Sequence, residues 1–269
     1  MFETMFDMLS LPFVQRALTA GISVSICAAI LGVTLILKRY SMIGDGLSHV
    51  AFGAWPIAFA IGWAPLEFTI PIVLIAAFFL LKMSQNSKIN ADAAIALVSC
   101  TSMAVGIMVI SLYGGMNLEN YMFGIITTVM PADVRMSVGL LIIVLSLFVL
   151  SYNQIFAITF DENFSRATGV KVDFYTLILA LLTSITIVLG MQLMGTMLIS
   201  SLIIFPGLSA MQLFKTFKPV VISAGIISAA AFFVGMMIST LGFPPGATIV
   251  LVNASIFICC ICASLVLKL

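Results

Sequence analysis

The stretch "ALTAGISVSICAAILGVTLIL", residues 17–37, contains no charged side chain. A membrane-spanning α-helix needs about 20 predominantly apolar residues, because each residue adds only 1.5 Å to the crossing of a hydrocarbon core about 30 Å thick. Further uncharged runs cover residues 93–118, 136–160, 174–214 and 219–267, and some of them are long enough to cross twice. This pattern sets the fold class: the chain crosses a membrane as helices.

The composition of the whole chain agrees with this reading. Of its 269 residues, 62% are hydrophobic and 8% are charged, whereas about 25% of the residues in a soluble domain are charged. In lipid an open chain satisfies its own backbone hydrogen bonds only as a helix. We therefore predict an all-α integral membrane protein, with residues 1–269 forming a single transmembrane domain.

The interruptions between the apolar runs predict where the helices lie. Eight or nine crossings are expected, in a bundle, at 12–37, 43–62, 67–81, 91–113, 134–152, 174–193, 197–213, 220–241 and 247–266. The segment 119–131 is too short to span, and we predict a half-helix there.

The basic residues predict the orientation of the bundle. If the first helix runs inward, nine of the 11 Lys and Arg residues lie in the cytoplasm. Because cytoplasmic loops of membrane proteins are enriched in Lys and Arg, this orientation is the favoured one. It leaves the N-terminus outside and the C-terminus in the cytoplasm.

Several classes of function are disfavoured. The net charge is +1 without a basic cluster, so nucleic acid is not an expected partner. The chain has no G-x-x-x-x-G-K-[ST] motif to hold ATP phosphates and no H-E-x-x-H motif of a zinc protease. We therefore predict that it is not an enzyme and that any energy comes from a partner.

The stretch "IGDGLSHVAFGA", residues 43–54, holds the only histidine of the chain, His49, four residues after Asp45. Residues at i and i+4 share one face of a helix. An ionisable group inside a membrane costs at least about 2.5 kcal/mol and is a functional group by default. Since carboxylate and imidazole are ligands for zinc and manganese, we predict that Asp45 and His49 bind a divalent metal. Two ligands do not complete a site, so a second copy of the chain is expected to supply another pair.

Two other interpretations of this pair remain open. The two side chains could form a hydrogen bond that only fixes helix packing. They could also relay protons in a proton-coupled secondary metal transporter. Such transporters often contain inverted repeats, and none is evident in this chain.

The segment "FDENFSRATGVKVD", residues 160–173, is the longest polar interruption. Asp161 and Glu162 favour a helix start, because acidic residues stabilise the N-terminal end of a helix. Gly169 is suited to end it. The segment is either a solvated connector or a helix that docks onto a soluble partner.

Four stretches in the same order carry a family resemblance: "LKRYSMIGDGLSHVAFGA" (37–54), "YMFGIITTV" (121–129), "FDENFSRATGVKV" (160–172) and "LMGTMLISSLIIFPGLSA" (193–210). Together they resemble the permease subunits of bacterial zinc and manganese ABC importers. The resemblance covers nearly the whole chain. It implies a type II ABC importer-like permease in the bacterial cytoplasmic membrane.

The resemblance also implies partners and roles. Two permease copies would join a cytoplasmic ATP-binding subunit, and an extracytoplasmic metal-binding protein would deliver the ion. The metal would be the cargo, with no permanently bound cofactor. Asp45 and His49 coincide with the metal-binding positions of the family. The positions that coincide with its ATPase-coupling helix are Asp161, Glu162, Phe164, Arg166, Ala167 and Gly169.

The choice of metal depends on a single position. Gly46 in "GDGLSHV" is more similar to the zinc-importing branch of the family. We therefore expect zinc slightly ahead of manganese.

Overall fold

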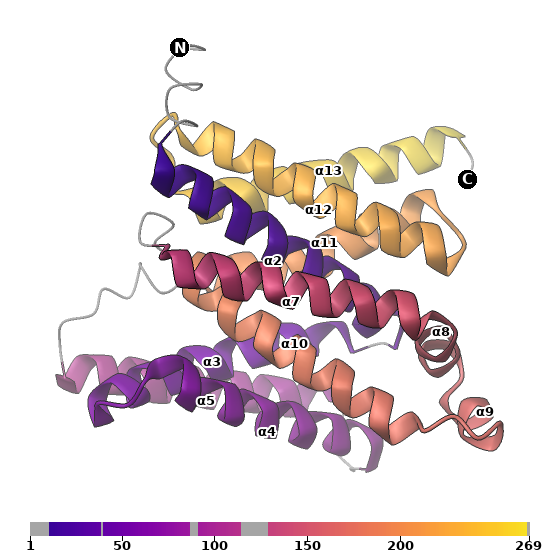
Figure 1. Ribbon diagram of the computed structural model, residues 1–269, viewed down its shortest axis with the longest axis horizontal. Helices are drawn as coiled ribbons and strands as arrows, with labels where there is room; N and C mark the ends of the chain where they lie inside the picture. The colour runs from indigo at the N-terminus through magenta and orange to yellow at the C-terminus, as the bar shows by residue number, and fades with distance from the viewer. Residues whose placement is uncertain (1–10, 39, 87–90, 114–128, 268–269) are drawn as a thin grey trace.

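The computed structural model describes residues 11–38, 40–86, 91–113 and 129–267 (Figure 1). Every regular element in this part of the chain is an α-helix. The helices are α2 (Pro12–Leu37), α3 (Ser41–Ile61), α4 (Pro65–Asn86), α5 (Ala91–Tyr113), α7 (Pro131–Leu150), α8 (Tyr152–Phe160), α9 (Glu162–Ala167), α10 (Val172–Met194), α11 (Thr196–Leu213), α12 (Phe217–Ser239) and α13 (Pro245–Leu267).

The long helices run side by side, and α2 lies in the middle of them. It contacts α7 on one side and α11 and α12 on the other, while α3, α4 and α5 pack together beyond α10 (Figure 1). Its buried positions include the small residues Ala20, Ala28 and Ala29. The central helix is therefore surrounded by protein.

Small residues allow the helices to approach closely. A side-chain atom on Gly32 of α2 would meet the backbone carbonyl of Ile203 on α11. Between α12 and α2, the Ser228 hydroxyl donates a hydrogen bond to the Ser25 carbonyl over 2.9 Å. Helix association in lipid depends on such close packing and polar contacts, because lipid tails are as apolar as the helix surfaces.

The basic residues mark one end of the bundle. At this end, to the right in Figure 1, α2 ends, α8 and α9 lie, and α12 begins. We call it the basic end, defined by Lys38, Arg166, Lys171, Lys215 and Lys218.

The expected helix positions are confirmed, but the expected number of crossings is not. Each of the nine expected ranges overlaps a helix. Among the described residues, however, only seven helices are long and apolar enough to cross a membrane. Helix α3 is not one of them. Helix α4 is not one either, because its apolar part, Pro65–Leu81, is shorter. The predicted eight or nine crossings are therefore not confirmed. The predicted half-helix at 119–131 falls mostly outside the described residues.

Helix α8 was not expected from the sequence. The backbone breaks at Ser151, where φ is −111° and ψ is 24°, and then resumes as a helix. Ile155 and Ile158 point into the core, at 0% and 1% exposed. Phe156 and Phe160 stack near Phe217 at the start of α12, with ring centroids 5.6 and 6.1 Å away. Burial of Ile155 and Ile158, together with the ring contacts of Phe156 and Phe160, accounts for the extra helix.

Candidate functional site

Helix α3 carries both predicted metal ligands near the basic end. It begins at Ser41, directly after the turn that follows α2, where the Tyr40 amide donates to the Leu35 carbonyl over 2.8 Å. At 1.5 Å per residue, Asp45 and His49 lie about 6 and 12 Å along the helix. Both are thus placed by a rigid element.

The two side chains approach each other along one face of α3. His49 Nε2 lies 3.8 Å from Asp45 Oδ2, and the side chains are 25% and 36% exposed. This distance is longer than a hydrogen bond, and both groups belong to the same helix. The pair therefore does not fasten α3 to another helix.

The spacing suits a shared cation. Two ligand atoms about 2.1 Å from one ion are about 3 to 3.5 Å apart in tetrahedral or octahedral geometry. A small rotation of either side chain would bring the observed 3.8 Å into this range.

The neighbouring faces of α3 are occupied by other helices. Toward α11, the hydroxyls of Ser48 and Ser200 are buried and 3.1 Å apart, and a side chain on Gly44 would meet Ile203. Toward α5, a side chain on Gly53 would meet the Ser102 carbonyl. Small residues on α3 thus allow both neighbouring helices to approach closely.

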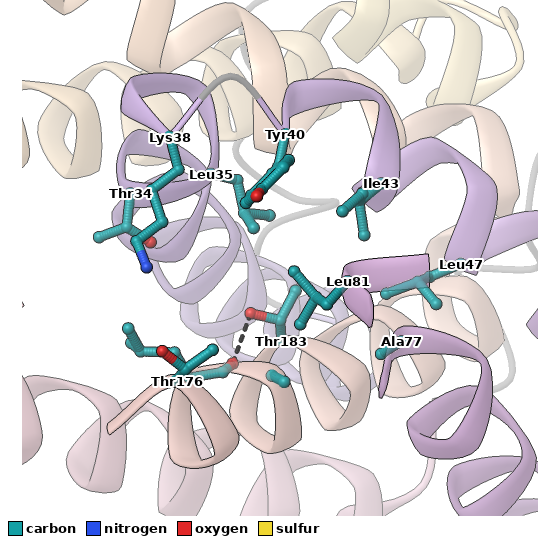
Figure 2. A pocket seen from close by; sticks show the side chains of 12 residues that line it. Thr34, Leu35, Lys38, Tyr40, Ile43, Leu47, Ala77, Leu81, Thr176 and Thr183 are labelled. Atoms are coloured by element: carbon teal, nitrogen blue, oxygen red, sulfur yellow. Dashed lines mark hydrogen bonds between the residues drawn. The ribbon is translucent and has the colours of Figure 1, made fainter. Parts of the chain in front are cut away.

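The core face of α3 borders a small cavity of about 40 Å³ (Figure 2). Ile43 and Leu47 line it from α3, and Lys38 and Thr176 lie on other walls. Since residues 43 and 47 are two positions before Asp45 and His49, they point about 200° away from the pair. The cavity is therefore separate from the predicted metal ligands.

A single chain brings the two predicted metal ligands together. Within the described ranges, no group of three or more His, Cys, Asp or Glu side chains could hold a metal ion. Asp45 and His49 are therefore the two candidate ligands that a single chain supplies, and the metal site at this pair stays a prediction.

The short helix predicted between Asp161 and Gly169 is present as α9. The Asp161 carboxylate accepts a hydrogen bond from the Phe164 amide over 2.9 Å, which caps the helix. The buried Ser165 hydroxyl donates to the Asp161 carbonyl over 2.7 Å. Gly169 adopts a positive φ of 85° after the helix, a conformation that glycine tolerates best.

The outer surface of α9 carries an exposed aromatic ring. Phe164 is 63% exposed, and Ala167 beside it is also exposed. Phe164 and Ala167 thus give α9 an exposed apolar surface.

Charged side chains connect α9 to the end of α2. Lys38 Nζ lies 3.7 Å from Glu162 Oε2, and Arg166 lies 3.5 Å from the other Glu162 oxygen. Arg166 also donates two hydrogen bonds to Asp173, over 2.8 and 3.1 Å. The contact of Lys38 with Glu162 was not predictable because it joins distant helix ends and leaves no local pattern. Asp173 lies only seven residues after Arg166 and was not predicted either.

Burial and charge act in opposite directions on Lys38. Burial lowers the pKa of its ammonium group, and the nearby Glu162 carboxylate partly offsets this effect. The two hydrogen bonds to Asp173 are the main cause that raises the pKa of Arg166. Glu162 therefore stabilises the charged form of Lys38, whose ammonium group is partly removed from water.

Comparisons with known proteins agree with this arrangement. Residues 10–264 match the ABC 3 transport family. The chain is 30% identical over 248 residues to the manganese import system permease protein ScaB of Streptococcus gordonii, covering 91% of this chain and 89% of that protein. It is also 30% identical over 256 residues to the manganese transport system membrane protein MntC of Halalkalibacterium halodurans, covering 94% and 88% of the two chains.

A solved structure has the same fold. The structure of PsaBC from Streptococcus pneumoniae in complex with Fab contains a chain that superposes with a TM-score of 0.87 at 30% identity, over 97% of this chain and 95% of that one. The chain therefore belongs to the ABC 3 transport family, and it is a membrane-spanning transport subunit rather than an enzyme.

Proposed function

We propose that this protein is the permease of an ATP-driven importer for a divalent transition metal ion, which passes between Asp45 and His49 and their counterparts in a second copy. The observation that carries the proposal is the incomplete ligand pair on α3, with its two ligand atoms 3.8 Å apart. The names of the manganese permeases reported above support the class of cargo.

The exposure of the pair supports a homodimer. Asp45 is 36% and His49 is 25% exposed in the single chain. A carboxylate facing lipid at this depth costs at least about 2.5 kcal/mol. A second copy related by two-fold symmetry covers both side chains and adds the same two ligands, which gives a four-ligand site.

The relatives bear on the choice of metal. Their names mention manganese, so the slight preference for zinc drawn from Gly46 has no support from them. We propose manganese as the first ion to test and zinc as the second.

The proposal assigns α9 to the partner ATPase. Phe164 and Ala167 supply the exposed apolar contact, while Asp161 and Gly169 fix the two ends of the helix. This orientation has the basic end in the cytoplasm, the N-terminus outside and the C-terminus inside. Termini on opposite sides require an odd number of crossings, so we propose nine of the predicted eight or nine. An extracytoplasmic metal-binding protein delivers the ion at the opposite end.

Metal uptake in cells that lack their own importers tests the proposal. The permease is expressed with its ATPase and binding protein, and uptake of manganese and zinc is compared for wild type, Asp45→Asn and His49→Ala. Both variants are expected to lose at least 90% of the uptake, because each removes two of the four proposed ligands from the dimer.

The matched control is Asp92→Asn, which changes an exposed carboxylate in the first turn of α5. It is expected to leave uptake unchanged. Wild-type uptake in both site variants at equal protein levels would remove the site assignment. Uptake without the ATPase would instead indicate the proton-coupled carrier.

A further inference from the structure

A groove on the outside of the bundle lies over α2, between α7 and α12. Figure 1 shows these three helices side by side. Its volume is about 980 Å³. The residues that line it are Ile26, Ile30, Leu145, Phe148, Val149, Tyr152, Asn153, Lys218, Val221, Ile222, Gly225, Ile226, Ala229 and Ala230.

Most of the groove is apolar and open to the outside. Val149 on α7 and Ile226 on α12 form opposite walls and are 76% and 65% exposed. Ile30 on α2 forms part of the floor and is 5% exposed. The small residues Gly225 and Ala229 leave space on the α12 side of the groove, so a flexible hydrocarbon chain can lie along it.

The polar lining residues gather at one end of the groove. Tyr152, Asn153 and Lys218 all belong to the basic end, where α8 follows α7 and α12 begins. In the part of the chain that the structure describes, Lys218 forms none of the ion pairs. A lysine that stands unpaired beside an amide and a phenol is suited to bind an anionic headgroup.

The aromatic cluster next to this end supports its position at the membrane surface. Tyr152 lies 5.7 Å from Phe217, between ring centroids, and Phe217 directly precedes Lys218. Tyrosine is enriched where the hydrocarbon region meets the headgroups.

The length of the groove fits one leaflet. Lys218 and Ala230 are 12 residues apart on α12, which corresponds to about 18 Å of helix. Half of a hydrocarbon core is about 15 Å thick. A lipid with its headgroup at Lys218 would therefore extend its chain to about Ala230.

We propose that this groove is a binding site for an anionic glycerophospholipid of the leaflet at the basic end. One acyl chain lies along α2 between α7 and α12, and the phosphate contacts Lys218 and Asn153. The site is independent of Asp45 and His49, which lie on a different helix.

Native mass spectrometry of the purified permease with its ATPase tests the proposal. The probes are phosphatidylglycerol and phosphatidylcholine with identical oleoyl chains. Lys218→Ala is expected to bind phosphatidylglycerol about fivefold more weakly than wild type, because one lysine near the headgroups contributes about 1 kcal/mol. Its matched control is Lys215→Ala, which removes a lysine of the same end that does not line the groove. This control is expected to bind like wild type.

A second variant tests the acyl-chain part of the site. Ala230→Trp fills the far end of the groove at a position that is already exposed, so it is expected to weaken both lipids without changing the melting temperature. Equal binding of phosphatidylglycerol by wild type and Lys218→Ala overturns the proposal, as does equal affinity for the two lipids. A shift from dimer to monomer in Ala230→Trp with unchanged lipid binding also overturns it, because a second copy would then cover the groove.

Discussion

The ion pair between Lys38 and Glu162 predicts an asymmetric response to mutation. The Lys38 side chain is 14% exposed and that of Glu162 is 33% exposed. Glu162→Gln leaves the more buried cation without its nearest carboxylate. Lys38→Met removes the cation, and Glu162 keeps Arg166 at 3.5 Å. We therefore expect Glu162→Gln to destabilise the protein more than Lys38→Met, and the double variant to be more stable than Glu162→Gln alone.

The distance gives the scale of the effect. Two unit charges 3.7 Å apart attract by about 4.5 kcal/mol at an effective dielectric constant of about 20. Water at the exposed third of Glu162 reduces this value, and exposed pairs contribute about 1 kcal/mol or less. Breaking a fully buried pair costs about 3 to 5 kcal/mol. For this half-buried pair we expect Glu162→Gln to cost about 1 to 2 kcal/mol.

The buried Cys27 thiol reports unfolding in this experiment. It is 0% exposed, so a fluorogenic maleimide reaches it only after the bundle opens. After the exposed thiols are blocked, the maleimide is expected to label Glu162→Gln about 5 to 30 times faster than wild type. This factor corresponds to the expected loss of about 1 to 2 kcal/mol in the free energy of opening. The control is Asp173→Asn, since the Asp173 side chain is 84% exposed. Equal labelling of wild type, Glu162→Gln and the double variant would refute the reasoning.

The same variant has a predicted pH dependence. Burial lowers the pKa of Lys38 below that of an unfolded lysine, about 10.4. Between the pKa of Lys38 in the folded protein and its pKa in the unfolded chain, the unfolded chain binds more protons than the folded protein. The free energy of unfolding therefore rises with pH in this window and is constant below it. Without Glu162 the pKa of Lys38 falls further, and the window extends to lower pH. The stability difference between wild type and Glu162→Gln should narrow as pH rises toward 10 in thermal unfolding; a constant difference would contradict this.

Two further variants test the packing of α3 and the cap of α9. Gly53→Ala places a methyl group against the Ser102 carbonyl and is expected to cost about 1 to 3 kcal/mol by overpacking, measured by thermal unfolding. Gly139→Ala is its control, since a methyl group there meets nothing within 4 Å, and equal melting temperatures would contradict the prediction. Asp161→Ala removes the acceptor of the Phe164 amide and is expected to cost about 1 kcal/mol; protease cleavage within α9 should become faster, and unchanged cleavage would argue against the cap.

Apolar runs located the long helices because lipid leaves the chain few alternatives to a helix. The first helix was expected at 12–37 and is α2, Pro12–Leu37. Helix α8 was missed because Ser151 interrupts an uncharged run without a glycine, a proline or a charge. The expected end of α7 at 152 lies close to the break, but nothing in the sequence indicated that a second helix follows it.

The candidate metal ligands could be proposed from the sequence because their signal is local. An i, i+4 carboxylate and histidine inside an apolar run fixes their spacing on a helix, and the 3.8 Å separation of Asp45 and His49 agrees with it. The partners of α3 were not predictable. Ser48 meets Ser200 because α3 and α11 lie side by side, and the contact joins residues 152 positions apart.

The turn between α2 and α3 links the two predicted sites through few residues. Lys38 ends α2 and contacts Glu162, the first residue of α9. Seven residues after Lys38, Asp45 begins the ligand pair on the next helix. If the proposed partner ATPase moves α9, the contact between Lys38 and Glu162 transmits this movement to the chain directly before α3. Asp45 and His49 lie on the same helix, so a displacement of α3 would move both side chains together. In the proposed dimer it would change the distance between the pair of one copy and the pair of the other, while the distance between Asp45 and His49 of one copy stays the same.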